Sequence, residues 1–209
     1  MVMSFFRRRD DSGIDRIEAQ VQLMVTDARH TFDLAMNALT GGSVASVGEE
    51  VRRTDRRINV TEMEIRRELV VHFSVHAAGD ATEMLVFMNM IKDLERIGDY
   101  NKNVFDLAEE GVSFLDADDL DRILGFRDEI SSRIALMGEI LTARDAERAR
   151  AYIARGDEML RGFDALVTEL VHSTTVANHA VPRALLYRFL RRICGHAMDV
   201  VTAVVMAVD

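Results

Sequence analysis

Proline, cysteine and aromatic residues are scarce in this sequence. It contains one proline and no tryptophan, and aromatic residues make up only 6% of its 209 positions. Because proline interrupts helices and because sheets favour aromatic and β-branched residues, this composition favours helices over sheets. The single cysteine, Cys194, can form neither an intramolecular disulfide nor a zinc cluster. We therefore expect an all-α protein in a reducing compartment, the cytoplasm.

Long apolar runs and an excess of positive charge are also missing. No uninterrupted apolar run approaches the roughly 18 residues that a membrane-spanning helix needs, and the N-terminus lacks the apolar region of a signal peptide. Acidic residues outnumber Lys and Arg by 35 to 26, which opposes binding to nucleic-acid phosphates. We therefore expect a soluble protein that binds no nucleic acid. Residues 1–12, with two Phe before three Arg, are predicted to be a tail that is peripheral to a membrane at most.

Apolar residues recur at helical spacing in six segments of the chain. Long one-sided helices joined by short turns pack as antiparallel bundles. The sixth segment is expected to begin close to Pro182, because proline is favoured in the first turn of a helix. The first three segments are predicted to run from Ser12 to the glycines at 41 and 42, from Ser43 to about Ala77, and from Asp80 to Gly111.

The two halves of the chain resemble each other, which predicts an internal duplication. TDRRINVTE at 54–62 aligns with GDEMLRGFD at 156–164, and LERIGDYNKNV at 94–104 aligns with LRRICGHAMDV at 190–200. The expected fold is all-α, with two tandem antiparallel three-helix bundles comparable to spectrin-like repeats. The predicted units are the tail at 1–12, a first bundle at 13–111 and a second bundle at 118–209.

Acidic and amide side chains share one face on each of two predicted helices. Carboxylates one turn apart repel each other, so such a face needs a metal cation, an arginine from elsewhere, or water. A plain solvated acidic face is the alternative to a metal site. Oxygen ligands of this kind suit Mg²⁺, Ca²⁺, Mn²⁺ or iron rather than copper. The residues are Asp55, Asn59 and Glu62 on the second helix and Glu95, Asp99 and Asn103 on the third.

The run ERIGDY at 95–100, followed by Asn103, resembles the signature of the PhoU family of phosphate-uptake regulators. This resemblance implies two tandem three-helix bundles whose E/D-x-x-x-D motifs bind metal ions on the bundle surface. It assigns metal binding to Glu95 and Asp99 with Asn103, and to their second-helix counterparts Asp55, Asn59 and Glu62. The implied ion is iron, zinc, manganese or magnesium.

The resemblance also implies a function. It suggests a non-enzymatic cytoplasmic regulator that contacts a phosphate ABC transporter and a sensor histidine kinase, and it is compatible with a homodimer. Some relatives accompany other ion or phosphate permeases, and this alternative stays open. A further alternative is a di-iron carboxylate enzyme, which needs paired Glu-x-x-His motifs. Only Glu169 with His172 fits that pattern, and neither a nucleophilic triad nor a glycine-rich phosphate loop is present.

The second copy departs from the acidic pattern. In the alignment Arg191 replaces Glu95, Gly195 replaces Asp99 and Arg161 replaces Asn59. The carboxylates that remain can pair with these arginines through charge-assisted hydrogen bonds, so we expect the second bundle to bind no metal. The alternative is that both arginines point into water.

Overall fold

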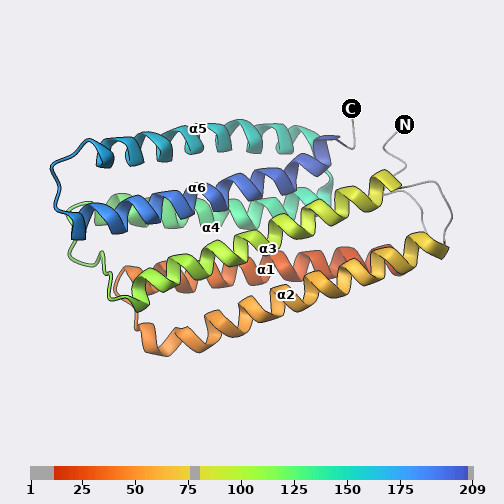
Figure 1. The fold of residues 1–209 in the computed structure, drawn as a ribbon. Coiled ribbons are helices and arrows are strands. Elements are labelled where there is room, and N and C mark those ends of the chain that lie inside the picture. The colour runs from red at the N-terminus through yellow and green to blue at the C-terminus, as the bar shows by residue number, and fades with distance from the viewer. Residues whose placement is uncertain (1–11, 76–80, 207–209) are drawn as a thin grey trace.

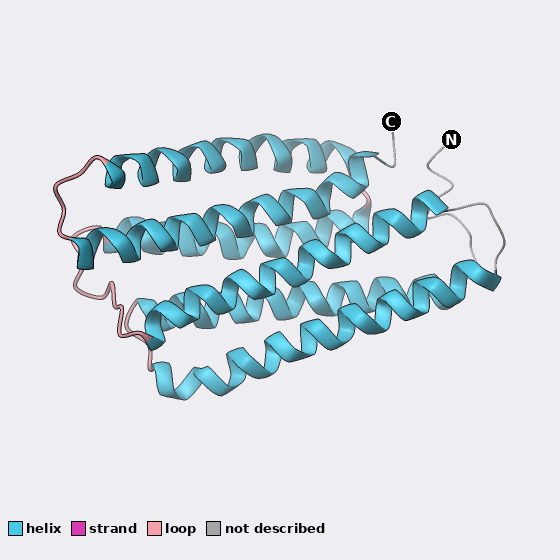
Figure 2. Cartoon of the chain, viewed as in Figure 1, coloured by secondary structure: helices cyan, strands magenta, loops and turns pink. Residues whose placement is uncertain are grey.

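The structure is a computed structural model that describes residues 12–75 and 81–206. These residues form six α-helices and no strand, which confirms the predicted all-α class (Figures 1 and 2). Residues 1–11 of the predicted tail, the predicted end of the second segment near Ala77 and the predicted start of the third at Asp80 lie outside the described residues. The helices are α1 (Ser12–Leu39), α2 (Val44–Val75), α3 (Ala81–Glu109), α4 (Leu120–Ala143), α5 (Ala146–Val171) and α6 (Ala177–Met206).

The helices lie side by side along the long axis of the molecule, with α5 at one outer face and α2 at the other (Figure 1). α1, α2 and α3 pack on one another, and α5 packs chiefly on α6. The two sets of three helices meet where α1 contacts α4 and α3 contacts α6. A single apolar core runs through both sets, from Ile17 on α1 to Val204 on α6.

Heptad-like apolar spacing explains why these segments are helices with one buried face. On α1 the buried positions include Ile17, Val21, Met24 and Ala28, which follow the alternating steps of four and three residues that keep side chains on one helical stripe. Burying such a stripe against another helix stabilises the fold by about 25 cal/mol for each Å² of apolar surface removed from water. None of the described helices has the length and apolar character that crossing a membrane would require.

Local signals fix the connections between helices. The α4–α5 turn is tight because Arg144 adopts a left-handed conformation (φ 54°) and the Asp145 carboxylate accepts a hydrogen bond from the Arg148 N–H at 3.0 Å. The α3–α4 connection is anchored on the first helix, since the Phe114 N–H donates to the Leu39 carbonyl at 2.7 Å. Short anchored connections hold neighbouring helices antiparallel.

The start of α6 differs from the sequence-based prediction. The helix begins at Ala177, so Pro182 lies inside it rather than at its first position. The N–H groups of His179 and Ala180 both reach the Val176 carbonyl, which starts the helix one and a half turns before the proline. Because a proline nitrogen has no hydrogen, Pro182 withholds only the bond to the Asn178 carbonyl, and the helix continues through it.

Candidate functional site

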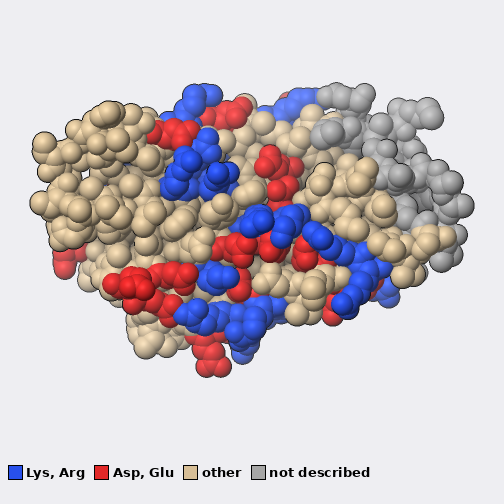
Figure 3. All heavy atoms as spheres, viewed as in Figure 1, with Lys and Arg blue, Asp and Glu red and all other residues tan. Residues whose placement is uncertain are grey.

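The predicted acidic face lies where α2 packs on α3. Asp55 and Glu62 are buried on α2, whereas Glu95 and Asp99 are half-buried on α3. The two helices approach closely because Gly98 has no side chain: a Cβ there would lie 3.1 Å from Ile58 Cδ1. Asn59 and Asn103 are also half-buried. Figure 3 shows acidic and basic side chains interleaved over this part of the surface.

Lysines and arginines neutralise each carboxylate of this face. Lys102 lies 3.4 Å from Asp55 and 3.7 Å from Asp99, so its ammonium bridges the two helices. Lys92 pairs with Glu95 at 2.7 Å, and Arg66 pairs with Glu62 at 2.7 Å on α2. Among the described residues, no three of these carboxylates bring oxygens within 4.8 Å of one another. The donor types suit a hard cation, but the ammonium and guanidinium groups hold the positions that a cation would take, so the six-ligand site stays a prediction.

In the predicted second copy, an ion pair stands where the first copy carries two acids. Arg191 Nε lies 2.6 Å from Asp164 Oδ1, and Arg188 lies 3.4 Å from the same oxygen. Asp164 aligns with Glu62 and Arg191 with Glu95. The geometry therefore agrees with an arginine that faces an acid rather than water, as expected for a copy that neutralises its own charge.

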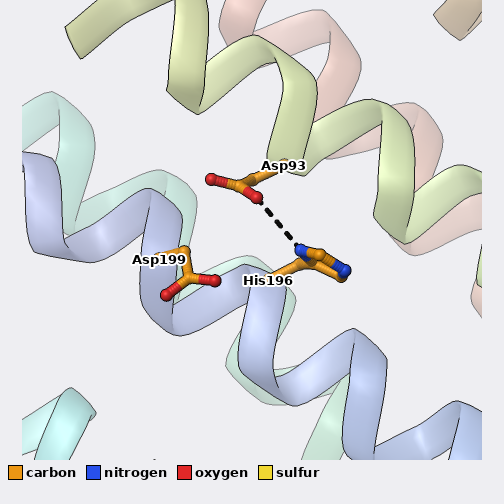
Figure 4. Close-up of side chains that lie close together, drawn as sticks. All are labelled: Asp93, His196 and Asp199. Atoms are coloured by element: carbon orange, nitrogen blue, oxygen red, sulfur yellow. Dashed lines mark hydrogen bonds and ion pairs between the residues drawn. The ribbon is translucent and has the colours of Figure 1, made fainter.

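A separate cluster lies between α3 and α6, at the meeting of the two halves. Asp93 Oδ1 on α3 lies 3.0 Å from Nδ1 of His196 on α6, and Asp199 stands three residues further along α6. One ligand atom from each of the three side chains lies within 4.8 Å of the other two. Figure 4 shows both carboxylates on the Nδ1 side of the imidazole, with the other ring nitrogen turned away.

The surroundings of this cluster are partly apolar. The ring of Tyr100 stacks on His196 with centroids 5.7 Å apart, and Phe189 lies on the other side of Tyr100 at 6.2 Å. Burial, and then the negative charge of Asp93, raise the pKa of the Asp199 carboxyl, while His196 acts in the opposite direction. A half-buried carboxylate, Asp93, and an exposed one, Asp199, thus lie beside a single half-buried imidazole.

Sequence reasoning missed this cluster because its parts are far apart in the chain. Asp93 precedes the acidic motif by two residues, and His196 and Asp199 lie a hundred residues later. The spacing of His196 and Asp199 by three residues was a usable signal, since it puts both on one helical face. Only the packing of α3 on α6 supplies the third group.

Other residues singled out from the sequence fall in ordinary places. Cys194 is buried, and burial raises the pKa of its thiol to about 12, which suits packing rather than reaction. Asn101 is buried and donates through Nδ2 to the Ala28 carbonyl at 2.7 Å, joining α3 to α1. Glu169 and His172 are exposed at the end of α5. The di-iron pattern therefore gains no inward-facing ligand from them.

Comparisons with known proteins agree with the fold and with the motif. Residues 21–108 match the model of the PhoU domain family. A relative, the phosphate-specific transport system accessory protein PhoU homolog of Deinococcus radiodurans, is 25% identical over 160 residues, which is 72% of this chain and 74% of that protein. The crystal structure of PhoU from Pseudomonas aeruginosa has a TM-score of 0.79 and 20% identity, and covers 94% of this chain and 97% of its own. The predicted resemblance is confirmed, and the structural likeness shows a shared fold.

Proposed function

We propose that this chain, which matches the PhoU domain model over residues 21–108 and shares the fold of a PhoU structure over nearly its whole length, regulates phosphate uptake. The observation that carries the proposal is the sequence match over about three-quarters of a phosphate transport accessory protein. We further propose that the chain acts in the cytoplasm by contacting a phosphate ABC transporter and its sensor histidine kinase, and catalyses no reaction itself.

The charged surface over α2 and α3 supports a role in protein contact. Acidic and basic groups alternate there (Figure 3). The apolar side chains of Val60 and Met63 on α2 are about half exposed. Mixed charges around apolar side chains favour orientation-specific association because complementary charges fix the register of two partners. α2 is an outer helix of the bundle, so this surface is open to a partner.

A metal site on the same face is a finer part of the proposal. Asp55 and Glu62 are nearly buried carboxylates, and a divalent cation would offset the cost of burying them more strongly than a lysine does. Binding through Asp55, Glu62, Glu95 and Asp99 would require Lys102 and Lys92 to turn into solvent. Asn59 and Asn103 would supply amide oxygens at the ends of the site.

A deletion strain tests the proposal. Removal of the gene should change phosphate uptake and the expression of a phosphate-starvation reporter in high and low phosphate, and the parent gene should restore both. Potassium uptake, measured in the same strains, is the control for the alternative that the protein serves another permease. Unchanged phosphate uptake and unchanged reporter expression would refute a phosphate role, and a defect confined to potassium would support the alternative.

A further inference from the structure

We propose that Asp93, His196 and Asp199 bind one divalent transition-metal ion, with Zn²⁺ as the best match, and that this ion ties α3 to α6. The site is distinct from the α2–α3 face, because its ligands come from α3 and α6, which pack on each other where the two halves of the molecule meet. The proposal does not depend on the regulatory role, since it rests on these three side chains alone.

The distances allow coordination with small side-chain movements. The three ligand atoms already lie within 4.8 Å of one another. Neighbouring ligands of a tetrahedral zinc ion with bonds of about 2.0–2.2 Å lie about 3.5 Å apart. Rotation of the Asp199 side chain, which is exposed and ion-paired with no Lys or Arg among the described residues, can close this difference.

Packing of α3 on α6 does not require these polar groups. Aligning Leu94–Val104 with Leu190–Val200 places Tyr100 opposite His196, and the same register pairs Asp93 with Phe189. On one side of the antiparallel contact, Tyr100 packs on Phe189 through ring contact. On the other side, the corresponding positions are Asp93 and His196. The aromatic contact of Tyr100 with Phe189 suffices to pack the two helices there. We therefore infer that the polar pair of Asp93 and His196 has a use other than packing.

Charge points the same way. Two carboxylates meet one imidazole, and among the described residues no lysine or arginine forms an ion pair with either of them. The raised pKa of Asp199 reflects burial first and the charge of Asp93 second. At the α2–α3 face, by contrast, each carboxylate has a cationic side chain. At the Asp93–His196–Asp199 cluster, a divalent ion would supply the positive charge that none of the described lysines or arginines provides.

The donor set selects the kind of ion. Imidazole is a good ligand for zinc, iron, nickel and copper, whereas magnesium and calcium prefer sites made of oxygen alone. One histidine with two carboxylates makes three protein ligands and leaves a fourth position for water or for a group from a partner. Mg²⁺ is therefore expected to bind this site far more weakly than Zn²⁺.

Calorimetric titration of the chelator-stripped full chain with Zn²⁺ and with Mg²⁺ tests the site. The parent should bind one Zn²⁺. In His196→Ala and in Asp93→Asn the affinity for Zn²⁺ should fall at least about tenfold, because even the loss of a residue that hydrogen-bonds a metal ligand costs about that much. Zinc should also raise the thermal unfolding midpoint of the parent, because an ion bound only to the folded state stabilises it. Asp93→Asn keeps the shape of the side chain and guards against a variant that fails to fold.

Two controls separate this site from other ions and from surface binding. His179→Ala removes an exposed histidine from the first turn of the same helix and should leave zinc binding unchanged. The double variant Glu95→Ala and Asp99→Ala removes half of the α2–α3 face and should retain the zinc that His196 holds, while losing any ion bound at that face. Equal zinc affinity and stoichiometry in the parent, His196→Ala and Asp93→Asn would overturn the proposal.

Discussion

Asp119 shows how one carboxylate can hold two helices together. It precedes α4 but does not cap it: its oxygens accept hydrogen bonds from Arg183 Nη2 at 2.7 Å, Arg122 Nη2 at 2.9 Å and the Tyr187 hydroxyl at 3.1 Å. Burial alone would raise the pKa of Asp119, but these three donors outweigh it and lower the pKa to about 2. The carboxylate thereby joins the start of α4 to α6.

We expect Asp119→Asn to lower the free energy of unfolding by roughly 1–2 kcal/mol at neutral pH, because the lowered pKa of Asp119 reflects how strongly the fold favours its charged form, with a reduction for solvent screening. The folded-state pKa is below the ordinary value of 3.8, so this stabilisation is fully present above about pH 4 and is lost as the pH falls toward 2. Urea unfolding at pH 7 and pH 3 should therefore show a smaller difference between parent and variant at pH 3.

The adjacent Asp118 provides the matched control for this pH series. Its side chain is 95% exposed, although it reaches Arg183 Nη2 at 3.2 Å. An exposed ion pair contributes little, so Asp118→Asn should change stability by less than about 0.5 kcal/mol at either pH. Equal losses in the two variants, or a loss in Asp119→Asn that does not depend on pH, would contradict the role assigned to Asp119.

At single residues, the sequence predicted positions on a helix better than partners across helices. Asn101 is a buried, hydrogen-bonded amide, and helical spacing alone places it on the core stripe. Asp93 and His196 were not paired in advance. Their contact depends on the offset between α3 and α6, which local spacing does not encode.

Among the elements, α5 carries two glycines in contrasting surroundings. Gly156 is buried, and a Cβ there would lie 2.7 Å from Met198 Cγ and 2.9 Å from Arg133 Nη2. Gly162 is exposed, and a Cβ there would meet nothing within 4 Å. Glycine therefore permits a close contact between helices at Gly156, whereas Gly162 faces open space.

We expect Gly156→Ala and Gly162→Ala to change stability in opposite directions. Alanine in an exposed helix interior is favoured over glycine by up to about 1 kcal/mol, so Gly162→Ala should raise the thermal midpoint. At Gly156 the same gain is outweighed by displacement of Met198 and Arg133, and overpacking costs about 1–3 kcal/mol. Thermal unfolding followed by circular dichroism measures both midpoints. A raised midpoint in both variants would contradict the prediction and would mean that Met198 on α6 moves aside at little cost.

Helix boundaries were predicted well where glycine and loop residues mark them and less well at α6. The end of α1 is at Leu39, just before the glycines at 41 and 42, and Gly41 has a positive φ of 119°. The start of α6 was placed at Pro182, although it lies at Ala177. Proline disfavours a preceding helix without forbidding it, and the packing of α6 decides the outcome.

At the scale of the molecule, the two sets of helices share one core. Gln22 on α1 donates to the Gly138 carbonyl on α4 at 3.2 Å, and a Cβ on Gly138 would lie 3.1 Å from Val25 Cγ1. Buried apolar residues of both sets belong to one continuous core. The fold class could be predicted from periodicity and from the motif, but this contact between α1 and α4 could not, because a repeat in the sequence does not state how its copies pack.

We expect the chain to unfold in a single thermal transition. The calorimetric enthalpy should equal the van't Hoff enthalpy, at about 150 kcal/mol near 60 °C from the usual value per residue. Gly138→Leu, which inserts a side chain between α4 and α1, should lower the midpoint, whereas Gly125→Leu, in open space on the same helix, should not. Two separate transitions in the parent would mean that the halves are independent domains.

The stacking of Tyr100 on His196, with ring centroids 5.7 Å apart, has a consequence for how such a chain evolves. These positions are counterparts in the predicted repeat, so each copy forms part of the other's environment. In such a repeat, a substitution at one of the two positions is selected in the presence of the counterpart residue across the contact. The predicted duplication therefore implies that the two copies could not diverge independently at this contact, where Tyr100 of the first copy faces His196 of the second.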